Sequence, residues 1–292
     1  MAVSASSPAA EMFQAERWRI ALTYAVTLLE NLFYLLYPWT IGLAIDGLLA
    51  GQGPWALMPL VAIWGAHIVV GAGRQVYDTW VFARIHAAIA AATIERQRSA
   101  GIDTTEIAAR SAMSRELVDF FEREVPTLMT AALGLVGGIA MLFWYDRLVG
   151  LVVTVWMLPV LVVYTLMGRR AHRLNMALND EVEREVDLIH RSRFGPLASH
   201  FRRRGRLRVR LSNAEARSWA LVELFSIAAV VLVILRMTAM PGIQAGELYA
   251  MLAYVWRVLE CLDQAPMLVQ RFARLIDIRR RIELGTDPAG AA

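Results

Sequence analysis

The sequence predicts an all-α membrane protein with six transmembrane helices and two long cytoplasmic helical hairpins. Two observations support this fold class. First, the 292 residues are 57% hydrophobic and 19% charged, a more apolar composition than that of a typical soluble domain. Second, apolar stretches of about 20 residues, the length that crosses a bilayer, recur along the chain and alternate with charged stretches.

Six apolar stretches qualify as membrane spans, and the last is the least apolar. In chain order they cover residues 20–49, 55–73, 126–145, 148–167, 219–235 and 247–283. Helical periodicity continues past the second stretch to about residue 98 and past the fourth to about residue 190. At 1.5 Å per residue each of these two helices is about 60 Å long, roughly twice the hydrocarbon core, so both should project beyond the membrane. The third span contains Gly134, Gly137 and Gly138, which let neighbouring helices approach closely.

Short turns join the spans on one side of the membrane, near Gly51, Asp146 and Pro241. On the opposite side the connections are long. In the second of them we expect Gly195 and Pro196 to end the fourth helix, since proline interrupts a helix. Residues 197–205 would then form the turning tip, and the fifth helix would begin near Leu207.

The distribution of arginine predicts the orientation. Residues 169–217 carry thirteen arginines, and eight of them, from Arg191 to Arg210, lie in a run without an acidic residue. Because arginine-rich loops remain in the cytoplasm, both termini and both hairpins should be cytoplasmic. A sequence pI near 9.6 would suggest nucleic acid as the partner of a soluble protein. Here the arginines flank membrane spans, so we expect no nucleic-acid partner.

Three regions are expected along the chain: a disordered segment at 1–15, a six-helix domain at 16–284 and a disordered tail at 285–292. The first 16 residues lack the basic start and apolar core of a signal peptide. Cys261 is the single cysteine, so it has no partner for an intrachain disulfide. All 30 basic residues are arginine, which we attribute to GC-rich coding in a bacterium.

Polar residues at membrane depth are the candidates for a substrate pathway. An ionisable group there costs at least about 2.5 kcal/mol, so it needs a partner or a water-filled cavity. Each group also has a structural alternative. Glu30 and Asn31, at mid-depth in the first span, could hydrogen-bond to another helix. Arg257 and Glu260, on one face of the last span, could form an ion pair with each other. The candidates are Glu30 and Asn31 in the first span, and Arg257, Glu260, Asp263 and Gln264 in the last.

Other polar residues favour structural roles. Arg74 and Asp78 are four residues apart and should form an intrahelical pair. His67 is more typical of a satisfied core histidine than of a proton relay, and Glu223 should pair with an arginine near the inner membrane edge. The acidic residues of 180–187 form either a solvated face or pairs with the arginines that follow. The sequence has no metal-ligand spacing and no catalytic arrangement, so we expect neither a metal site nor an enzyme.

Short outer turns combined with two long inner hairpins resemble the plan of the six-helix membrane domain of ABC exporters. Residues 38–46, PWTIGLAID, resemble the end of that family's first helix, and residues 246–252, GELYAML, resemble the start of its last. Residues 105–110, TEIAAR, are similar to the segment after the first coupling helix. Residues 275–283 are similar to the exit toward the nucleotide-binding domain. These segments occur in the same order and at similar spacing as in that family, and the resemblance extends over about residues 16–284.

The resemblance implies a permease subunit of an ABC-exporter-like system in the bacterial inner membrane, with a pathway formed by a homodimer or heterodimer. A separate ATPase would drive it, because a chain without lysine has no GxxxxGK[ST] loop to hold nucleotide phosphates. ATP would therefore act only through that partner, and no other cofactor is expected. The hairpin tips would dock the ATPase through Ile102, Asp103, Thr104, Thr105, Leu197, Ser199, His200 and Phe201.

The alternative is an ATP-independent channel, carrier, or structural or regulatory membrane protein on the same scaffold. Its motivation is the second hairpin, which is far richer in arginine than a simple coupling joint requires. Arg202, Arg203 and Arg204 are candidates for contact with a partner or with anionic lipid headgroups, which attract such residues by about 1 kcal/mol each. A neighbouring gene for a lone ATPase domain would favour the first hypothesis.

Overall fold

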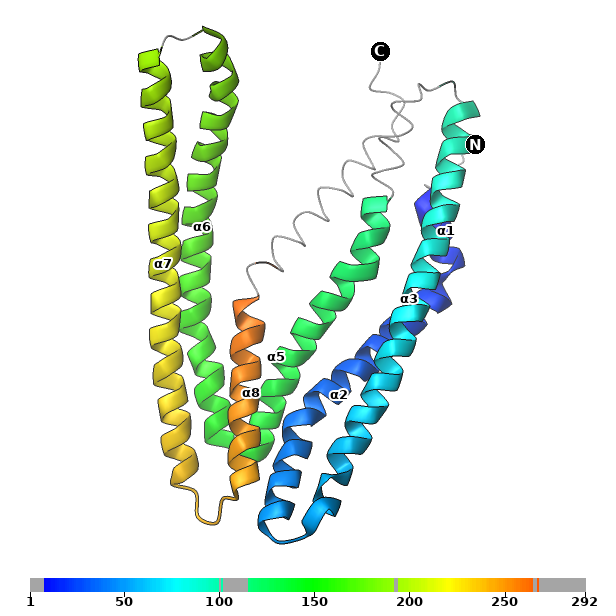
Figure 1. The fold of residues 1–292 in the computed structure, drawn as a ribbon, viewed down its shortest axis with the longest axis vertical. Helices are drawn as coiled ribbons and strands as arrows, with labels where there is room; N and C mark the ends of the chain where they lie inside the picture. Colours follow the sequence, from blue (N-terminus) through cyan, green and yellow to red (C-terminus); the bar gives the residue numbers. More distant parts are fainter. Residues whose placement is uncertain (1–7, 100, 102–114, 192–193, 265–266, 268–292) are drawn as a thin grey trace, which may run out of the picture. The chain divides into compact units, whose positions relative to one another are not determined.

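The computed structural model describes residues 8–99, 101, 115–191, 194–264 and 267, and the regular elements in these ranges are all helical (Figure 1). This confirms the all-α class. The elements are α1 (Pro8–Ala15), α2 (Arg17–Leu49), the 3-10 helix η1 (Gly53–Leu57), α3 (Met58–Ser99), the π-helical turn η2 (Phe120–Glu124), α5 (Val125–Tyr145), α6 (Arg147–Arg191), α7 (Phe194–Thr238) and α8 (Ala245–Asp263). The chain forms two compact units. The first contains Met1–Met141 and Gln244–Ala292, and the second contains Leu142–Ile243.

Five helical segments are long and apolar enough to cross a membrane, and they coincide with the first five predicted spans. They are Arg17–Leu49, Gly53–Ser99, Arg115–Tyr145, Arg147–Glu185 and Ala198–Thr238. Many large apolar side chains on these helices are exposed, among them Val69, Trp144 and Leu235. Helices that are apolar around most of their circumference suit a lipid environment. The described part of the predicted sixth span is α8, which has 19 residues. The six-span count therefore stays a prediction.

In the first unit, one face of α3 supplies a buried apolar cluster. Its residues recur every three or four positions, as the core face of a helix requires. They are Val81, Phe82, Ile85 and Ile89, and Val118 joins them. Met12 and Phe13 pack against this cluster. Residues 8–15 are therefore a helix anchored to α3, and not part of the disordered segment expected at 1–15.

The glycine patch of α5 has the predicted role in close packing. A Cβ atom added at Gly134 would lie 2.7 Å from Sγ of Cys261, and one at Gly138 would lie 2.9 Å from a methyl group of Val258. At Gly137 it would lie 2.8 Å from a methyl group of Leu35. Since real Cβ atoms do not approach so closely, these glycines let α5 lie against side chains of α2 and α8.

In the second unit, α6 and α7 lie side by side along their length (Figure 1). The very short turn predicted at Asp146 is confirmed, because this residue alone separates α5 from α6. Asp146 Oδ1 accepts a hydrogen bond from the backbone N–H of Val149 at 2.9 Å, which caps the start of α6. Asp146 Oδ2 accepts another from Arg236 at 2.7 Å, near the end of α7. The hydrogen bond from Arg236 lowers the pKa of Asp146 below its ordinary value.

The predicted turn of the second hairpin was misplaced. Helix α6 continues to Arg191 and α7 already begins at Phe194, so Gly195, Pro196 and residues 197–205 belong to α7. The physical reason is the position of the proline. In the first turn of a helix the backbone N–H groups have no intrahelical acceptor, so proline starts a helix there as readily as it ends one elsewhere.

Candidate functional site

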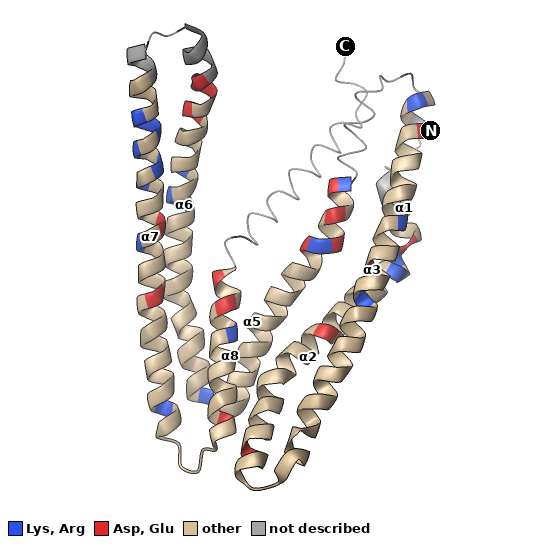
Figure 2. Cartoon of the chain, viewed as in Figure 1, with Lys and Arg blue, Asp and Glu red and all other residues tan. Residues whose placement is uncertain are grey.

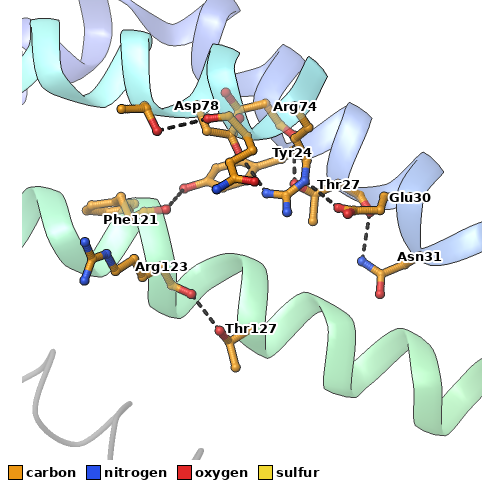
Figure 3. Close-up of polar contacts among 12 residues, drawn as sticks. Tyr24, Thr27, Glu30, Asn31, Arg74, Asp78, Phe121, Arg123 and Thr127 are labelled. Atoms are coloured by element: carbon orange, nitrogen blue, oxygen red, sulfur yellow. Dashed lines mark hydrogen bonds and ion pairs between the residues drawn. The ribbon is translucent and has the colours of Figure 1, made fainter. Parts of the chain in front are cut away.

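A charged cluster joins α2 and α3 in the first unit (Figure 3). Arg74 lies between two carboxylates: its Nε donates to Glu30 Oε2, and its Nη1 donates to Asp78 Oδ2 at 2.7 Å. The predicted pair of Arg74 and Asp78 is thereby confirmed. The side chains of Glu30 and Asp78 are only 13% and 7% exposed. One guanidinium thus balances two largely desolvated carboxylates, and its loss would leave both without a full counter-charge.

His67 lies on the same side of α3 and has partners at both ring nitrogens. Its Nε2 is 3.6 Å from Glu30 Oε1, and its Nδ1 shares a hydrogen bond with the hydroxyl of Tyr37. The ring also meets Tyr34 edge-on, with centroids 4.4 Å apart. His67 is therefore a satisfied histidine between two helices, in agreement with the structural interpretation of its sequence position.

The neighbouring polar residues of α2 are satisfied locally. Asn31 donates from Nδ2 to the carbonyl of Thr27 at 2.8 Å, and the hydroxyl of Thr27 donates to the carbonyl of Thr23 at 2.9 Å. Tyr24 reaches further and donates its hydroxyl to the carbonyl of Phe121 at 3.1 Å (Figure 3). Of the two first-span candidates, Glu30 therefore has its partners on another helix, whereas Asn31 bonds within its own.

The cluster lies far from the turn that joins α2 to α3. With 1.5 Å per residue, Glu30 is about 28 Å from Leu49 along α2, and Arg74 is about 31 Å from Gly53. A hydrocarbon core is about 30 Å thick, so the distance from the turn to the cluster is comparable to the thickness of that core. The mid-depth position expected for Glu30 stays a prediction.

The last-span candidates lie at the C-terminal end of α8. Arg257 is 3.4 Å from Glu260, which confirms the predicted pair, and its guanidinium lies 5.9 Å from the ring centre of Tyr34. Because Tyr34 contacts His67, the structure links Arg257 to the α2–α3 cluster through two rings. Glu260, Asp263 and Gln264 are all exposed in the single chain.

This arrangement suits binding and positioning more than covalent chemistry. It offers guanidinium groups, carboxylates and aromatic rings, which recognise ligands through charge and stacking. Among the described residues there is no group of three or more His, Cys, Asp or Glu side chains that could hold a metal ion.

A contact between α2 and α8 was missed in the sequence. Asp46 Oδ1 accepts a hydrogen bond from the backbone N–H of Gly246 at 2.6 Å, at the start of α8. A Cβ atom at Gly42 would lie 2.6 Å from the carbonyl oxygen of Gly246. Further along, the hydroxyl of Tyr254 donates to the carbonyl of Leu35 at 2.7 Å. The signal was present, since residues 38–46 and 246–252 were each singled out, but nothing in the sequence pairs them.

In the second unit, acidic side chains of α6 pair with basic side chains of α7. Glu181 lies 3.1 Å from Nδ1 of His200 and 2.9 Å from Nε of Arg203, and Glu185 pairs with Arg204. Figure 2 shows acidic residues near one end of α6 and basic residues along the same half of α7. The acidic group at 180–187 thus includes residues that pair with the arginines that follow, one of its two expected roles.

The predicted docking tips divide into three groups. Ile102, Asp103, Thr104 and Thr105 lie outside the described residues, as does the side chain of Leu197. His200 is buried in the hairpin, whereas Ser199 and Phe201 are exposed on α7. Of the three candidates for lipid or partner contact, Arg203 and Arg204 pair with Glu181 and Glu185, and Arg202 is exposed on α7.

Comparison with protein families identifies the class of the protein. The family model for the ABC transporter transmembrane region matches residues 11–246. This range covers most of the 292 residues, from α1 to the start of α8. The chain therefore belongs to this family, and its apolar helices are those of a membrane protein. A comparison with curated proteins found no match.

Proposed function

We propose that this chain is the transmembrane subunit of an ABC-exporter-like transport system, in which two copies, or this chain and a related one, form the pathway. A separate ATPase drives the system. The observation that carries the proposal is the family match over residues 11–246. Helix length supports it: α3, α6 and α7 have 42 to 45 residues. At 1.5 Å per residue they exceed a 30 Å hydrocarbon core about twofold, which leaves long extensions for a soluble partner.

The need for a separate ATPase is supported by composition. The phosphate-binding loop of such ATPases requires a lysine, and none occurs among these 292 residues. ATP would then act on this chain only through its partner. The transmembrane regions of this family supply a route across the membrane. This chain would therefore form the pathway, and the ATPase would supply the energy.

The charge distribution supports an orientation in the bacterial inner membrane. In the second unit, arginines crowd the half of α7 that lies away from its connection to α8 (Figure 2). Arginine-rich segments stay on the cytoplasmic side. This end, and both termini, would therefore be cytoplasmic, and the turn at Asp146 would face outward.

Within the first unit, Arg257 and Glu260 are better placed to meet a substrate than Glu30. Both carboxylate oxygens of Glu30 have charged or ionisable partners on α3, so its charge holds two helices together. Glu260 is exposed beside Arg257, and Asp263 follows one turn later. We assign the substrate-facing role to this end of α8, at the cytoplasmic mouth of the pathway.

Purification of the tagged full chain from its native membranes tests the proposal. A P-loop ATPase should co-purify, and its rate of ATP hydrolysis in nanodiscs should change severalfold when this chain is present. A matched preparation carrying an unrelated six-span protein controls for detergent and lipid effects. Failure of any ATPase to associate, with transport that persists without ATP, would favour an ATP-independent channel or carrier.

A further inference from the structure

An open groove of about 530 Å³ runs between α6 and α7 in the arginine-rich half of the second unit. Asn175, Asn179 and Val182 of α6 line one side, and Phe201, Gly205 and Arg208 of α7 line the other. Its volume lies within the range of small-molecule sites. None of the residues that line the groove belongs to the proposed substrate-facing end of α8.

Gly205 leaves an open place in the wall of the groove. A glycine in the interior of an exposed helix lowers helix stability, and neither packing nor backbone conformation accounts for this one. Packing is not the reason, because a Cβ atom at this position would meet nothing within 4 Å. Backbone conformation is not the reason either, since Gly205 is not among the glycines with positive φ. The missing side chain leaves the backbone of α7 bare where it borders the groove.

The charges of the groove define what it would bind. Arg204, which also borders it, is neutralised by Glu185. Arg208 is exposed and makes no ion pair with any residue in the described ranges. No acidic residue lines the groove. The carboxamides of Asn175 and Asn179 add hydrogen-bond donors. One uncompensated guanidinium flanked by amide donors suits a single anionic group.

The rest of the lining suits an apolar body. Phe201 and Val182 are 46% and 45% exposed, so two large apolar side chains face the solvent beside the bare backbone of Gly205. A flat hydrocarbon or aromatic group could cover both side chains and pass close to the helix backbone. An anion without such a body would leave this surface in water.

We propose that this groove binds a small organic anion that has one carboxylate, sulfonate or phosphate group attached to a flat apolar body. Arg208 and the two asparagines hold the head, and the body lies over Gly205 between Phe201 and Val182. The site goes beyond the proposed transport function, because it lies in the hairpin and needs neither substrate nor ATPase.

The same chemistry could come from the aqueous phase or from a lipid. Along α7, Arg208 is about 16 Å from Trp219, an exposed aromatic residue at the end of the apolar stretch. The headgroup layer adds only about 5 to 8 Å on each side of the hydrocarbon core. A water-soluble anion therefore reaches the groove more directly than a lipid that remains in the bilayer.

Titration of the full-length protein with 2-naphthoate, in nanodiscs of neutral phosphatidylcholine, tests the site by calorimetry. Arg208→Gln should weaken binding at least about tenfold, because it removes the charged hydrogen bond to the head. Gly205→Ala should weaken binding severalfold and at the same time raise Tm, since alanine favours the helix. Arg202→Gln removes the same charge from the same helix outside the groove, and it should leave binding unchanged.

Three results would overturn the site: an equal loss in Arg202→Gln, unchanged binding in both groove variants, or a loss confined to Arg208→Gln. An equal loss in Arg202→Gln would show that the anion is attracted to any arginine of this helix. A loss confined to Arg208→Gln would show that it binds the charge of Arg208 alone and does not occupy the groove. Competition by nanodiscs that contain anionic phosphatidylglycerol would identify lipid as the source of the anion, whereas an absence of competition indicates a soluble one. Because the assay contains no ATPase, the binding result does not depend on whether the proposed transport function is correct.

Discussion

Charged side chains tie helices together in both units, but the two sets of ion pairs differ in how much water reaches them. In the first unit, Arg74 lies between Glu30 and Asp78, and all three side chains are largely shielded from water. In the second unit, Glu181 is 6% exposed, whereas its partner Arg203 is 62% exposed. The first set joins α2 to α3, and the second joins α6 to α7 outside the apolar stretches.

This difference determines what each set contributes. Removing one partner of a shielded pair leaves a charge in a medium of low dielectric constant, which costs several kcal/mol. Removing a partner that reaches water leaves a charge that is resolvated, and the loss is small. The first unit should therefore be sensitive to single charge removals, and the second should tolerate them unless the buried glutamate itself is changed.

The largest effect is expected from Arg74→Met, which leaves Glu30 and Asp78 without their shared counter-charge. The free energy of unfolding in detergent micelles should fall by about 3 to 5 kcal/mol. Arg84→Met is the matched control on the same helix, because Arg84 is exposed and lies 3.4 Å from Glu16. It should cost less than about 1 kcal/mol. Equal losses in the two variants would mean that the α2–α3 cluster is not shielded.

Packing in the first unit is tested by Gly42→Ala. The added methyl group would lie 2.6 Å from a backbone oxygen of α8, so α2 and α8 must separate. We expect a loss of about 3 kcal/mol in unfolding free energy, at the upper end of the usual cost of overpacking. Gly65→Ala is the control, since its Cβ would meet nothing within 4 Å. That variant should gain up to about 1 kcal/mol from helix propensity. A loss there comparable to that of Gly42→Ala would contradict this account of the contact.

The contacts of Glu30 and Asp46 with other helices could not be predicted from the sequence. Periodicity and span length located five apolar helices, the turn at Asp146 and the pair of Arg74 and Asp78, because these depend on residues close together in the chain. The contacts from Glu30 to Arg74 and from Asp46 to Gly246 join residues 44 and 200 positions apart. Such contacts depend on the rotation and axial register of one helix against another, which a single sequence does not specify.

The turn of the second hairpin was misplaced for a different reason. Gly195 and Pro196 suit both the end of one helix and the first turn of the next. Local propensity could not decide between these positions. The pairs of His200 and Arg203 with Glu181 favour a helix there, since residues three apart lie on one face of a helix. Those pairs are tertiary contacts. From the sequence, a solvated acidic face at residues 180–187 was an equal alternative to such pairs.

In the second unit, Glu181→Gln should have a moderate effect. It removes the charge that accepts bonds from His200 and Arg203, for a loss of about 1.5 to 2 kcal/mol. Hydrogen exchange should accelerate on α6 and α7 and remain unchanged on α2 and α3. The matched variant Glu183→Gln alters an exposed acid on the same helix, and exchange should be unaffected. Faster exchange across the first unit as well would contradict a role limited to the hairpin.

The smallest effect concerns Asp146 and its pH dependence. Because the pKa of Asp146 is lowered in the folded protein, its pairing with Arg236 stabilises the fold fully above the ordinary aspartate value of about 3.9. This stabilisation is lost as the pH falls through the lower, folded pKa. Asp146→Asn keeps a capping side chain for α6, so it should cost less than about 1 kcal/mol at neutral pH. Thermal unfolding of this variant should vary less with pH below about 4 than that of the original protein, and an unchanged profile would remove Asp146 from the explanation.

Site-specific photo-crosslinking in native membranes tests the central claim most directly, namely that a separate ATPase docks on the arginine-rich end of this chain. A photoreactive residue at the exposed position Ser199 would be compared with one at Trp144, which is also exposed and lies beside the turn at Asp146. We predict that position 199 captures a P-loop ATPase and that position 144 does not. Capture of the ATPase at position 144, or at neither position while transport continues without ATP, would contradict the account.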